Sequence, residues 1–272
     1  MYFQDKIVVI TGASSGIGKA MAAGFLAQGA KVALCARNLD KLRDAFKDFD
    51  NNNLLLVAAD VSKEDDCKSF VSDVVTKWGA IDALINNAGI SMRALFEDVE
   101  LDVLRELMDI NFWGTVYMCK YSLPSILQSK GIIAGVSSIA GYRGLPARTG
   151  YSSSKFAMQG FLESLRTELL HTGAHVMWVS PGFTASNIRN TALSANGAAQ
   201  KETPLDEGKL MSAEECAQRI IRAMELRKRT VVMTVQGKMA VWLNKLIPSF
   251  VDNKVYNLFL KEPDSPLLKY KK

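Results

Sequence analysis

The sequence predicts an α/β protein in which a central seven-stranded parallel sheet lies between two layers of helices. Short runs of Val, Ile, Leu and Ala alternate along the chain with longer segments of mixed polarity. Most positions in each short run are apolar, which is typical of parallel strands that helices cover on both faces. Strands and helices that alternate at this spacing predict a doubly wound, three-layer sandwich.

Seven runs are predicted to be strands, and the longer segments between them helices. The strands are expected at residues 6–10 (KIVVI), 31–35 (KVALC), 53–60 (NLLLVAAD), 82–86 (DALIN), 131–138 (GIIAGVSS), 175–180 (HVMWVS) and 230–235 (TVVMTV). The helices are expected at residues 16–28, 39–49, 63–77, 101–128, 151–170 and 213–225. A helix between two strands returns the chain to the edge of the sheet where the first strand began, so neighbouring strands run parallel.

Size and composition favour one domain. The chain has 272 residues, 48% of them hydrophobic, which suffices for one sizeable core. No Pro/Gly/Ser-rich linker divides it, so we expect a single domain over residues 1–235 and a C-terminal extension over residues 236–272. The net charge of +5 is spread along the chain and not clustered as in nucleic-acid binders, so no nucleic-acid partner is expected.

Cysteine usage and the start of the chain indicate a reducing compartment. The four cysteines, Cys35, Cys67, Cys119 and Cys216, form no CxxC motif, so we expect buried free thiols and no metal or thiol-redox site. No basic region followed by an apolar signal core opens the chain, and no uninterrupted apolar run reaches ~18 residues. The expected location is the cytoplasm.

The stretch VVITGASSGIGKA, residues 8–20, fits two motifs. As G-x-S-x-G it would place a hydrolase nucleophile at Ser14, followed along the chain by an acid and then a histidine. A hydrolase elbow usually follows several strands, whereas this one follows the first. The only histidines, His171 and His175, flank a predicted helix end, which disfavours the hydrolase.

As G-x-x-x-G-x-G, the same stretch is a phosphate-binding turn between the first strand and the first helix. Gly12, Gly16 and Gly18 would let the backbone approach a pyrophosphate, and the free N–H groups of the helix would bind it. The spacing differs from G-x-G-x-x-G, but the position after the first strand favours this interpretation. The stretch therefore predicts a Rossmann-type nucleotide-binding fold.

Tyr151 and Lys155 lie four residues apart, which puts both on one face of the predicted helix. A phenol with a pKa of ~10 is a poor acid or base near neutral pH. A nearby ammonium lowers the phenol pKa, so Tyr151 would then exchange a proton with a substrate oxygen. Taken alone, such a pair is common on helix surfaces.

Four motifs in order resemble the short-chain dehydrogenase/reductase family over about residues 5–235: TGASSGIG, NNAG, a serine thirteen residues before the tyrosine, and YSSSK. The resemblance implies a catalytic tetrad of Asn111, Ser138, Tyr151 and Lys155. Ser138 would hold the substrate oxygen, and Tyr151 would transfer the proton. Lys155 would lower the tyrosine pKa and bind the nicotinamide ribose, while Asn111 would hold a water that links the lysine to solvent.

The same resemblance implies the residues that hold a nicotinamide dinucleotide. Asp60 would bond the adenine amino group with Val61 beside the ring, and Asn87 and Gly89 would lie near the adenine ribose. The segment SPGFTAS would orient the nicotinamide carboxamide. The implied cofactor-binding residues are Gly12, Ser14, Ser15, Gly16, Ile17, Gly18, Arg37, Asn38, Asp60, Val61, Asn87, Ala88, Gly89, Tyr151, Lys155, Pro181, Gly182 and Thr184.

The end of the second strand favours NADP(H) over NAD(H). NAD enzymes place an acid there to bind the ribose hydroxyls. Here Ala36 occupies that position and Arg37 follows, so no carboxylate repels a phosphate and a guanidinium can bind it. Asn38 and Ser14 are expected to assist. The pattern resembles the NADP-preferring branch of the family.

By resemblance, the loop after the fourth strand, residues 139–150 and a mobile lid over about residues 186–210 form the substrate pocket. The apolar candidates for its lining are Leu95, Phe96, Tyr142, Leu145, Phe183 and Ile188. They favour a hydrophobic substrate. Arg93, Arg143 and Arg148 leave room for an acidic group on that substrate.

The C-terminal extension resembles a basic amphipathic helix that Pro248 interrupts. Its apolar residues are Met239, Trp242, Leu243, Leu246, Ile247, Phe250, Val251, Val255, Leu258 and Phe259, and its lysines are Lys238, Lys245, Lys254 and Lys261. We expect the extension to cover the substrate pocket or to pack in a dimer interface. The alternative is peripheral contact with a membrane surface.

The sequence therefore predicts an NADP(H)-dependent oxidoreductase that interconverts a carbonyl and a secondary alcohol on a small hydrophobic molecule. The resemblance implies a homodimer or homotetramer through the helices at 101–128 and 151–170. A non-catalytic NADP-binding sensor of the same fold is the alternative, but such proteins usually lack the Tyr/Lys pair. A nucleotide-sugar epimerase would carry G-x-x-G-x-x-G, which this glycine turn does not match.

Overall fold

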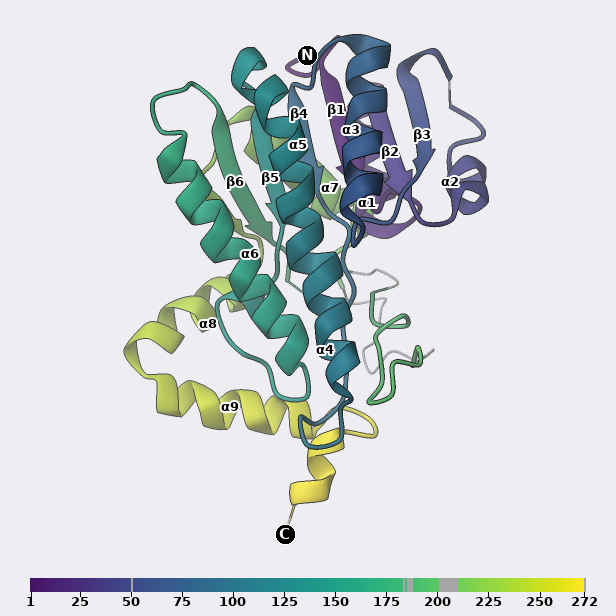
Figure 1. Ribbon diagram of the computed structural model, residues 1–272. Helices are drawn as coiled ribbons and strands as arrows, with labels where there is room; N and C mark the ends of the chain where they lie inside the picture. Colours follow the sequence, from purple (N-terminus) through teal and green to yellow (C-terminus); the bar gives the residue numbers. More distant parts are fainter. Residues whose placement is uncertain (50, 183, 185–187, 201–209, 272) are drawn as a thin grey trace.

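The computed structural model describes residues 1–49, 51–182, 184, 188–200 and 210–271. Its centre is a seven-stranded parallel sheet with the order β3-β2-β1-β4-β5-β6-β7 (Figure 1). The strands are β1 Ile7–Thr11, β2 Lys31–Ala36, β3 Leu54–Ala58, β4 Ala83–Asn86, β5 Ile132–Val136, β6 His175–Ser180 and β7 Thr230–Val232. The predicted doubly wound α/β sandwich is confirmed.

Helices cover both faces of this sheet. They are α1 Gly16–Ala27, α2 Leu39–Ala45, α3 Glu64–Trp78, α4 Leu101–Met108, α5 Gly114–Ser129, α6 Thr149–Glu168, α7 Ala213–Glu225, α8 Val235–Leu246 and α9 Pro248–Leu260. One apolar core lies between the sheet and α1, α2 and α7. A second lies between the sheet and α3, α5 and α6, so the molecule has three layers (Figure 1).

The strands β1 to β6 contribute side chains to both cores, which explains their continuous apolar runs. In β1, Val8 and Ile10 pack in the same core as Phe25 of α1. Val9 points the opposite way and packs in the core that contains Phe70 of α3. Side chains alternate between the faces of a strand, so burial on both faces requires apolar residues at consecutive positions. The four cysteines are buried free thiols, as predicted.

The strand order changes direction between β1 and β4. The chain builds β2 and β3 on one side of β1, and then starts β4 on the other side. The connections that leave β1 and β4 therefore diverge, and a crevice forms at the carboxyl ends of these two strands. This topology positions the cavity described below.

The helix predicted at 101–128 is two helices with a π-helical turn, Asp109–Trp113, between them. Asn111 lies in this turn, and its amide bonds both the backbone N–H and the carbonyl of Ile90. Isolated π turns of this kind often occur at functional sites. The seventh strand is also shorter than predicted, because the Thr234 hydroxyl accepts a hydrogen bond from the Gly237 N–H and begins α8.

The C-terminal extension forms α8 and α9, and Pro248 is the first residue of the second helix, as the predicted interruption requires. Both helices lie beyond the end of the sheet, next to the N-terminal end of α6 (Figure 1). In the part of the chain that the structure describes, no helix has both the length and the apolar character that a membrane crossing requires.

Candidate active site

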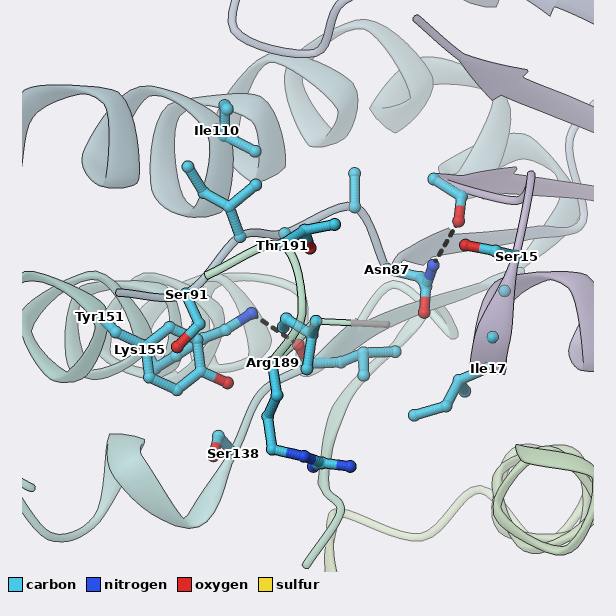
Figure 2. A pocket seen from close by; sticks show the side chains of 18 of the residues that line it. Ser15, Ile17, Asn87, Ser91, Ile110, Ser138, Tyr151, Lys155, Arg189 and Thr191 are labelled. Carbon is cyan, nitrogen blue, oxygen red and sulfur yellow. Dashed lines mark hydrogen bonds between the residues drawn. The ribbon is translucent and has the colours of Figure 1, made fainter. Parts of the chain in front are cut away.

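A cavity of about 620 Å³ lies at the carboxyl ends of the strands, where the strand order changes direction. Residues of the glycine turn line one part of it, and Ser138, Tyr151 and Lys155 line another. Figure 2 shows these two groups on opposite sides, with Arg189 between the tetrad residues and Ile17.

The glycine turn after β1 packs tightly against the segment that follows β4. Gly12 has a φ of +66°, and a Cβ at this position would lie only 2.7 Å from the Cα of Ala88. The side-chain amide of Asn87 donates to the carbonyl oxygens of Thr11 and Gly12 at 2.9 and 3.0 Å. Asn87, predicted to lie near the adenine ribose, lines the cavity, and its amide also holds the turn in place.

Helix α1 points its N-terminus at this turn. The Ser15 side chain makes no capping hydrogen bond, and the first turn of α1 carries no acidic residue. The free N–H groups and the positive end of the helix dipole therefore remain for an anion. Backbone and helix together fit the phosphates of a dinucleotide cofactor.

The predicted cofactor residues all line this cavity except Asn38. The side chain of Asn38 accepts a hydrogen bond from the Lys41 N–H at 2.8 Å and caps α2, so it acts in the helix and not in the cavity. The carboxylate of Asp60 lines the cavity and also accepts hydrogen bonds from the N–H and hydroxyl of Ser62.

Ser138 and its neighbour Ser137 have different environments. Ser138 begins a short 3-10 turn, where its hydroxyl accepts from the Ala140 N–H at 3.1 Å, and it faces Tyr151 in Figure 2. The hydroxyl of Ser137 instead accepts from the Gln159 side chain at 2.8 Å. The contact with Tyr151 is therefore made by Ser138, the position selected by its spacing.

Lys155 is buried, and its ammonium donates to the Val136 carbonyl oxygen at 2.9 Å. Burial lowers the pKa of Lys155 to about 8, because the charged form loses hydration. A Cβ on Gly89 would come within 3.0 Å of the Asn111 amide oxygen and 3.3 Å of the Lys155 nitrogen. The absence of a side chain at Gly89 thus leaves the space in which these two groups approach each other.

The pKa of Tyr151 lies above its ordinary value. Burial is the main cause, and a hydrogen bond with Ser138 and the positive charge of Arg189 act in the opposite direction. The sequence predicted a pKa lowered by Lys155, and this expectation is wrong for the protein without nucleotide. Lys155 lies 5.8 Å from the centre of the tyrosine ring and directs its charge at the Val136 carbonyl.

Asn111 does not line the cavity but is fully buried behind it. Its amide oxygen accepts from the Ile90 N–H at 2.8 Å, and its amide nitrogen donates to the Ile90 carbonyl and to Ser154 Oγ at 2.9 and 2.8 Å. Ser154 in turn donates to the Tyr151 carbonyl at 2.8 Å. The side chain of Asn111 therefore connects the segment after β4 to the first turns of α6.

The arginines near the substrate pocket hold the C-terminal extension. Arg148 donates to both carboxylate oxygens of Glu262 at 2.8 and 2.9 Å, and Arg93 donates to the same carboxylate at 3.3 Å. Arg143 pairs with Asp252 of α9. All three guanidinium groups are paired with the extension, so the structure offers no support for an acidic substrate group at these positions.

The extension also forms part of the cavity wall, in agreement with the prediction that it covers the pocket. Phe259 and Glu262 line the cavity together with Leu145. Phe259 packs against Leu95, and the Arg148 guanidinium lies 4.5 Å from its ring centre. An aromatic ring therefore closes the substrate end of the cavity.

The other apolar candidates are distributed differently. Ile188 lines the cavity, but Phe96 is 64% exposed. The Tyr142 hydroxyl accepts a hydrogen bond from the Trp178 indole at 2.8 Å, and its ring packs against the core between the sheet and α3, α5 and α6. Phe183 lies outside the described residues.

The predicted lid at 186–210 is described only at residues 188–200 and 210. Leu193 pairs there with the segment after β4, because its N–H donates to the Ser91 carbonyl and its own carbonyl accepts from the Arg93 N–H. The described part of the lid thus lies against that segment.

Sequence reasoning missed several residues that line the cavity. They include Lys41, Ser91, Arg189, Thr191 and Glu262. Lys41 follows Arg37 within the same LCARNLDK stretch, so its position close to the end of β2 was a usable signal. Glu262 lies beyond the family motifs and was not among the residues named in the extension, so only its packing reveals it.

Comparison with known proteins agrees with this geometry. A model of the short chain dehydrogenase family matches residues 6–197. This chain is a member of the short-chain dehydrogenase/reductase family. Members of the family use a nicotinamide cofactor to interconvert alcohol and carbonyl groups, and this dehydrogenase is an oxidoreductase of that kind.

Relatives of this dehydrogenase span most of its length. It is 34% identical over 255 residues to "Dehydrogenase/reductase SDR family member 7B" of Mus musculus, covering 91% of this chain and 79% of the relative. It is 34% identical over 253 residues to "11-beta-hydroxysteroid dehydrogenase-like 4A" of Arabidopsis thaliana, covering 92% and 83%. A short-chain dehydrogenase from Streptomyces avermitilis shares the fold with a TM-score of 0.80, at 23% identity over 93% of this chain and 97% of that chain.

The lowered pKa of Lys155 predicts a pH-dependent stability. Between about 8 and the ordinary 10.5, the unfolded chain binds more protons at this site than the folded chain does. The free energy of unfolding should therefore rise from pH 8 to 9.5 relative to Lys155→Met, by up to ~1.4 kcal/mol per pH unit. Denaturant titrations of the nucleotide-free proteins measure this difference. The exposed Lys19→Met is the control, and an equal pH effect there would refute the assignment.

Removal of the Glu262 carboxylate should destabilise the pocket wall. Glu262→Gln leaves Arg93 and Arg148 facing each other with side chains only 13% exposed, which should cost about 3 kcal/mol of unfolding free energy. Asp252→Asn, the matched control, breaks the pair with Arg143 at a carboxylate that is 59% exposed, and should cost less than about 1 kcal/mol. Thermal and denaturant unfolding measure the loss of unfolding free energy in both variants. Equal losses would contradict the role assigned to the Glu262 carboxylate between Arg93 and Arg148.

Proposed function

We propose that this protein is an NADPH-dependent reductase that converts the carbonyl of a small hydrophobic molecule to a secondary alcohol. The observation that carries the proposal is the convergence of Ser138, Tyr151 and Lys155 in one cavity with a phosphate-binding turn. The hydroxysteroid dehydrogenase-like name of one relative agrees with an apolar substrate. Leu145, Ile188 and Phe259 supply an apolar lining for it.

In the proposed reaction, the bound nicotinamide supplies the hydride. Tyr151 donates its proton to the carbonyl oxygen, so that no free alkoxide accumulates. The phenol is protonated at neutral pH, as a proton donor for reduction must be, but burial raises its pKa and weakens it as an acid. Stabilisation of the developing phenolate by Ser138 and Lys155 is assigned the task of offsetting this effect. Ser138 donates a hydrogen bond to the same substrate oxygen and stabilises the charge that develops on it.

Lys155 and Asn111 support this proton transfer. With a pKa of about 8, the Lys155 ammonium is mostly charged at neutral pH and stabilises the phenolate left after transfer. We assign to the same ammonium the binding of the nicotinamide ribose. Asn111, held by Ile90 and Ser154, is assigned the positioning of a water that returns a proton through Lys155.

Preference for NADPH is supported by the charges at the end of β2. Ala36 stands where an NAD-binding acid would lie, and Arg37 and Lys41 both line this end of the cavity. Two cations without a neighbouring carboxylate on the strand end suit the additional phosphate of NADPH. This charge pattern is the reason for choosing NADPH over NADH.

Reversal of the charge at Arg37 should change the affinity for NADPH much more than the affinity for NADH. Arg37→Asp removes a charge-assisted hydrogen bond and adds repulsion, so NADPH affinity should fall roughly 10- to 100-fold, while NADH affinity should stay within about threefold. Fluorescence titration with each nucleotide measures both. Arg43→Asp, at an exposed site on α2, is the matched control. Equal loss for both nucleotides would remove the NADPH assignment.

Turnover should depend on the Tyr151 hydroxyl. Tyr151→Phe keeps the ring and should retain NADPH binding, but its rate on an accepted carbonyl should fall roughly 100-fold or more. Assays of NADPH oxidation against a panel of hydrophobic ketones and aldehydes test this together with nucleotide titration. Tight NADPH binding by the unmodified protein without turnover on any member would contradict the proposal and favour a sensor.

A further inference from the structure

Helix α8 carries an uncovered apolar stripe. Val235, Met239, Trp242 and Leu246 are exposed by 72, 56, 62 and 58%. They follow one another at intervals of four, three and four residues, which places them on one face of the helix. A large indole and three aliphatic side chains in such a row are unusual on a surface that faces only water.

Helix α9 also exposes large apolar side chains, and it is apolar on two faces. Phe250 and Leu258 are exposed by 50 and 55%. Val251 and Phe259, one position further along the helix in each case, are buried at 5 and 4% exposure. One face of α9 therefore packs against the body and forms the cavity wall, while the other leaves large apolar side chains outside. We call the exposed residues of both helices the α8–α9 face.

Lysines border the α8–α9 face. Lys238, Lys245, Lys254 and Lys261 are all exposed. The only acidic residue between positions 235 and 261 is Asp252, and its carboxylate is paired with Arg143. The α8–α9 face thus combines apolar side chains with an excess of positive charge.

We propose that the α8–α9 face binds the surface of a bilayer that contains anionic lipid, with both helices lying in the interface. The apolar side chains would enter the acyl boundary, Trp242 would lie at the headgroup level, and the lysines would extend toward the phosphates. This binding would hold the helix that closes the cavity against the membrane. It does not depend on the reaction assigned above.

A second copy of the chain is a poorer occupant than a membrane. A two-fold contact would place the same patch of both copies together, so the lysines of both copies would gather in one interface that holds few acidic groups to neutralise them. Like charges in an interface oppose association, whereas anionic headgroups neutralise them. Charge complementarity therefore selects the lipid surface.

Vesicle sedimentation of the full chain tests this proposal. We expect binding to vesicles of phosphatidylcholine with about 30% phosphatidylserine, and weaker binding to phosphatidylcholine alone. The double variant Trp242→Ser/Leu246→Ser should lower the partition coefficient for the mixed vesicles at least tenfold. Lys238→Gln/Lys245→Gln should lower binding to the mixed vesicles more than binding to the neutral ones.

The control is Leu170→Ser, at a side chain 67% exposed just beyond the C-terminal end of α6, the opposite end of that helix from α9 (Figure 1). It should bind vesicles like the unmodified protein. Retained NADPH binding, checked in each variant, shows that the fold is intact, because none of the substituted residues lines the cavity. Lipids brominated in their acyl chains should also quench the tryptophan fluorescence of the unmodified protein, and Trp242→Phe should reduce that quenching.

Three results would overturn the proposal. The first is an unmodified protein that does not sediment with either vesicle. The second is loss of binding in Leu170→Ser equal to that in Trp242→Ser/Leu246→Ser. The third is an oligomer, seen by analytical ultracentrifugation, that the double variant dissociates while lipid binding is absent, which would assign the face to contact between copies.

Discussion

The close packing of the glycine turn against the segment after β4 is the constraint on which the candidate site depends. No Cβ fits between Gly12 and Ala88, and the Asn87 amide holds two carbonyls of the turn. The same segment contains Gly89, beside which Asn111 and Lys155 approach each other. A single stretch of chain thus joins the phosphate-binding side to the proton-transfer side, and a displacement on one side would be transmitted to the other.

Burial of polar groups shifts the pKa values of this site and also costs free energy of hydration. Lys155 and Asn111 are both removed from water. The hydrogen bonds of the Asn111 amide offset its loss of hydration, whereas the ammonium of Lys155, with one carbonyl partner, retains a cost that appears as its lowered pKa. The same exclusion of water lowers the pKa of Lys155 and raises that of Tyr151. Both shifts follow from burial, which disfavours the charged form of each group.

The C-terminal extension connects the cavity to the outer surface of the molecule. Its inner side is held by two arginines on one buried carboxylate and places Phe259 at the cavity. Its outer side exposes Trp242 and lysines. The same extension therefore forms part of the cavity wall and carries the face proposed to contact a membrane.

The sequence alone determined the parallel sheet, the glycine turn and the Tyr151 and Lys155 pair, because each depends on local spacing along a strand or helix. Only the tertiary structure decided the environment of these groups. Asn38 caps a helix, and burial outweighs any effect of Lys155 on the tyrosine pKa. Likewise, Glu262 meets Arg148 and Arg93 across 114 and 169 positions of the chain. Contacts at such separations, and the exclusion of water that they produce, follow from packing and leave no periodic pattern in the sequence.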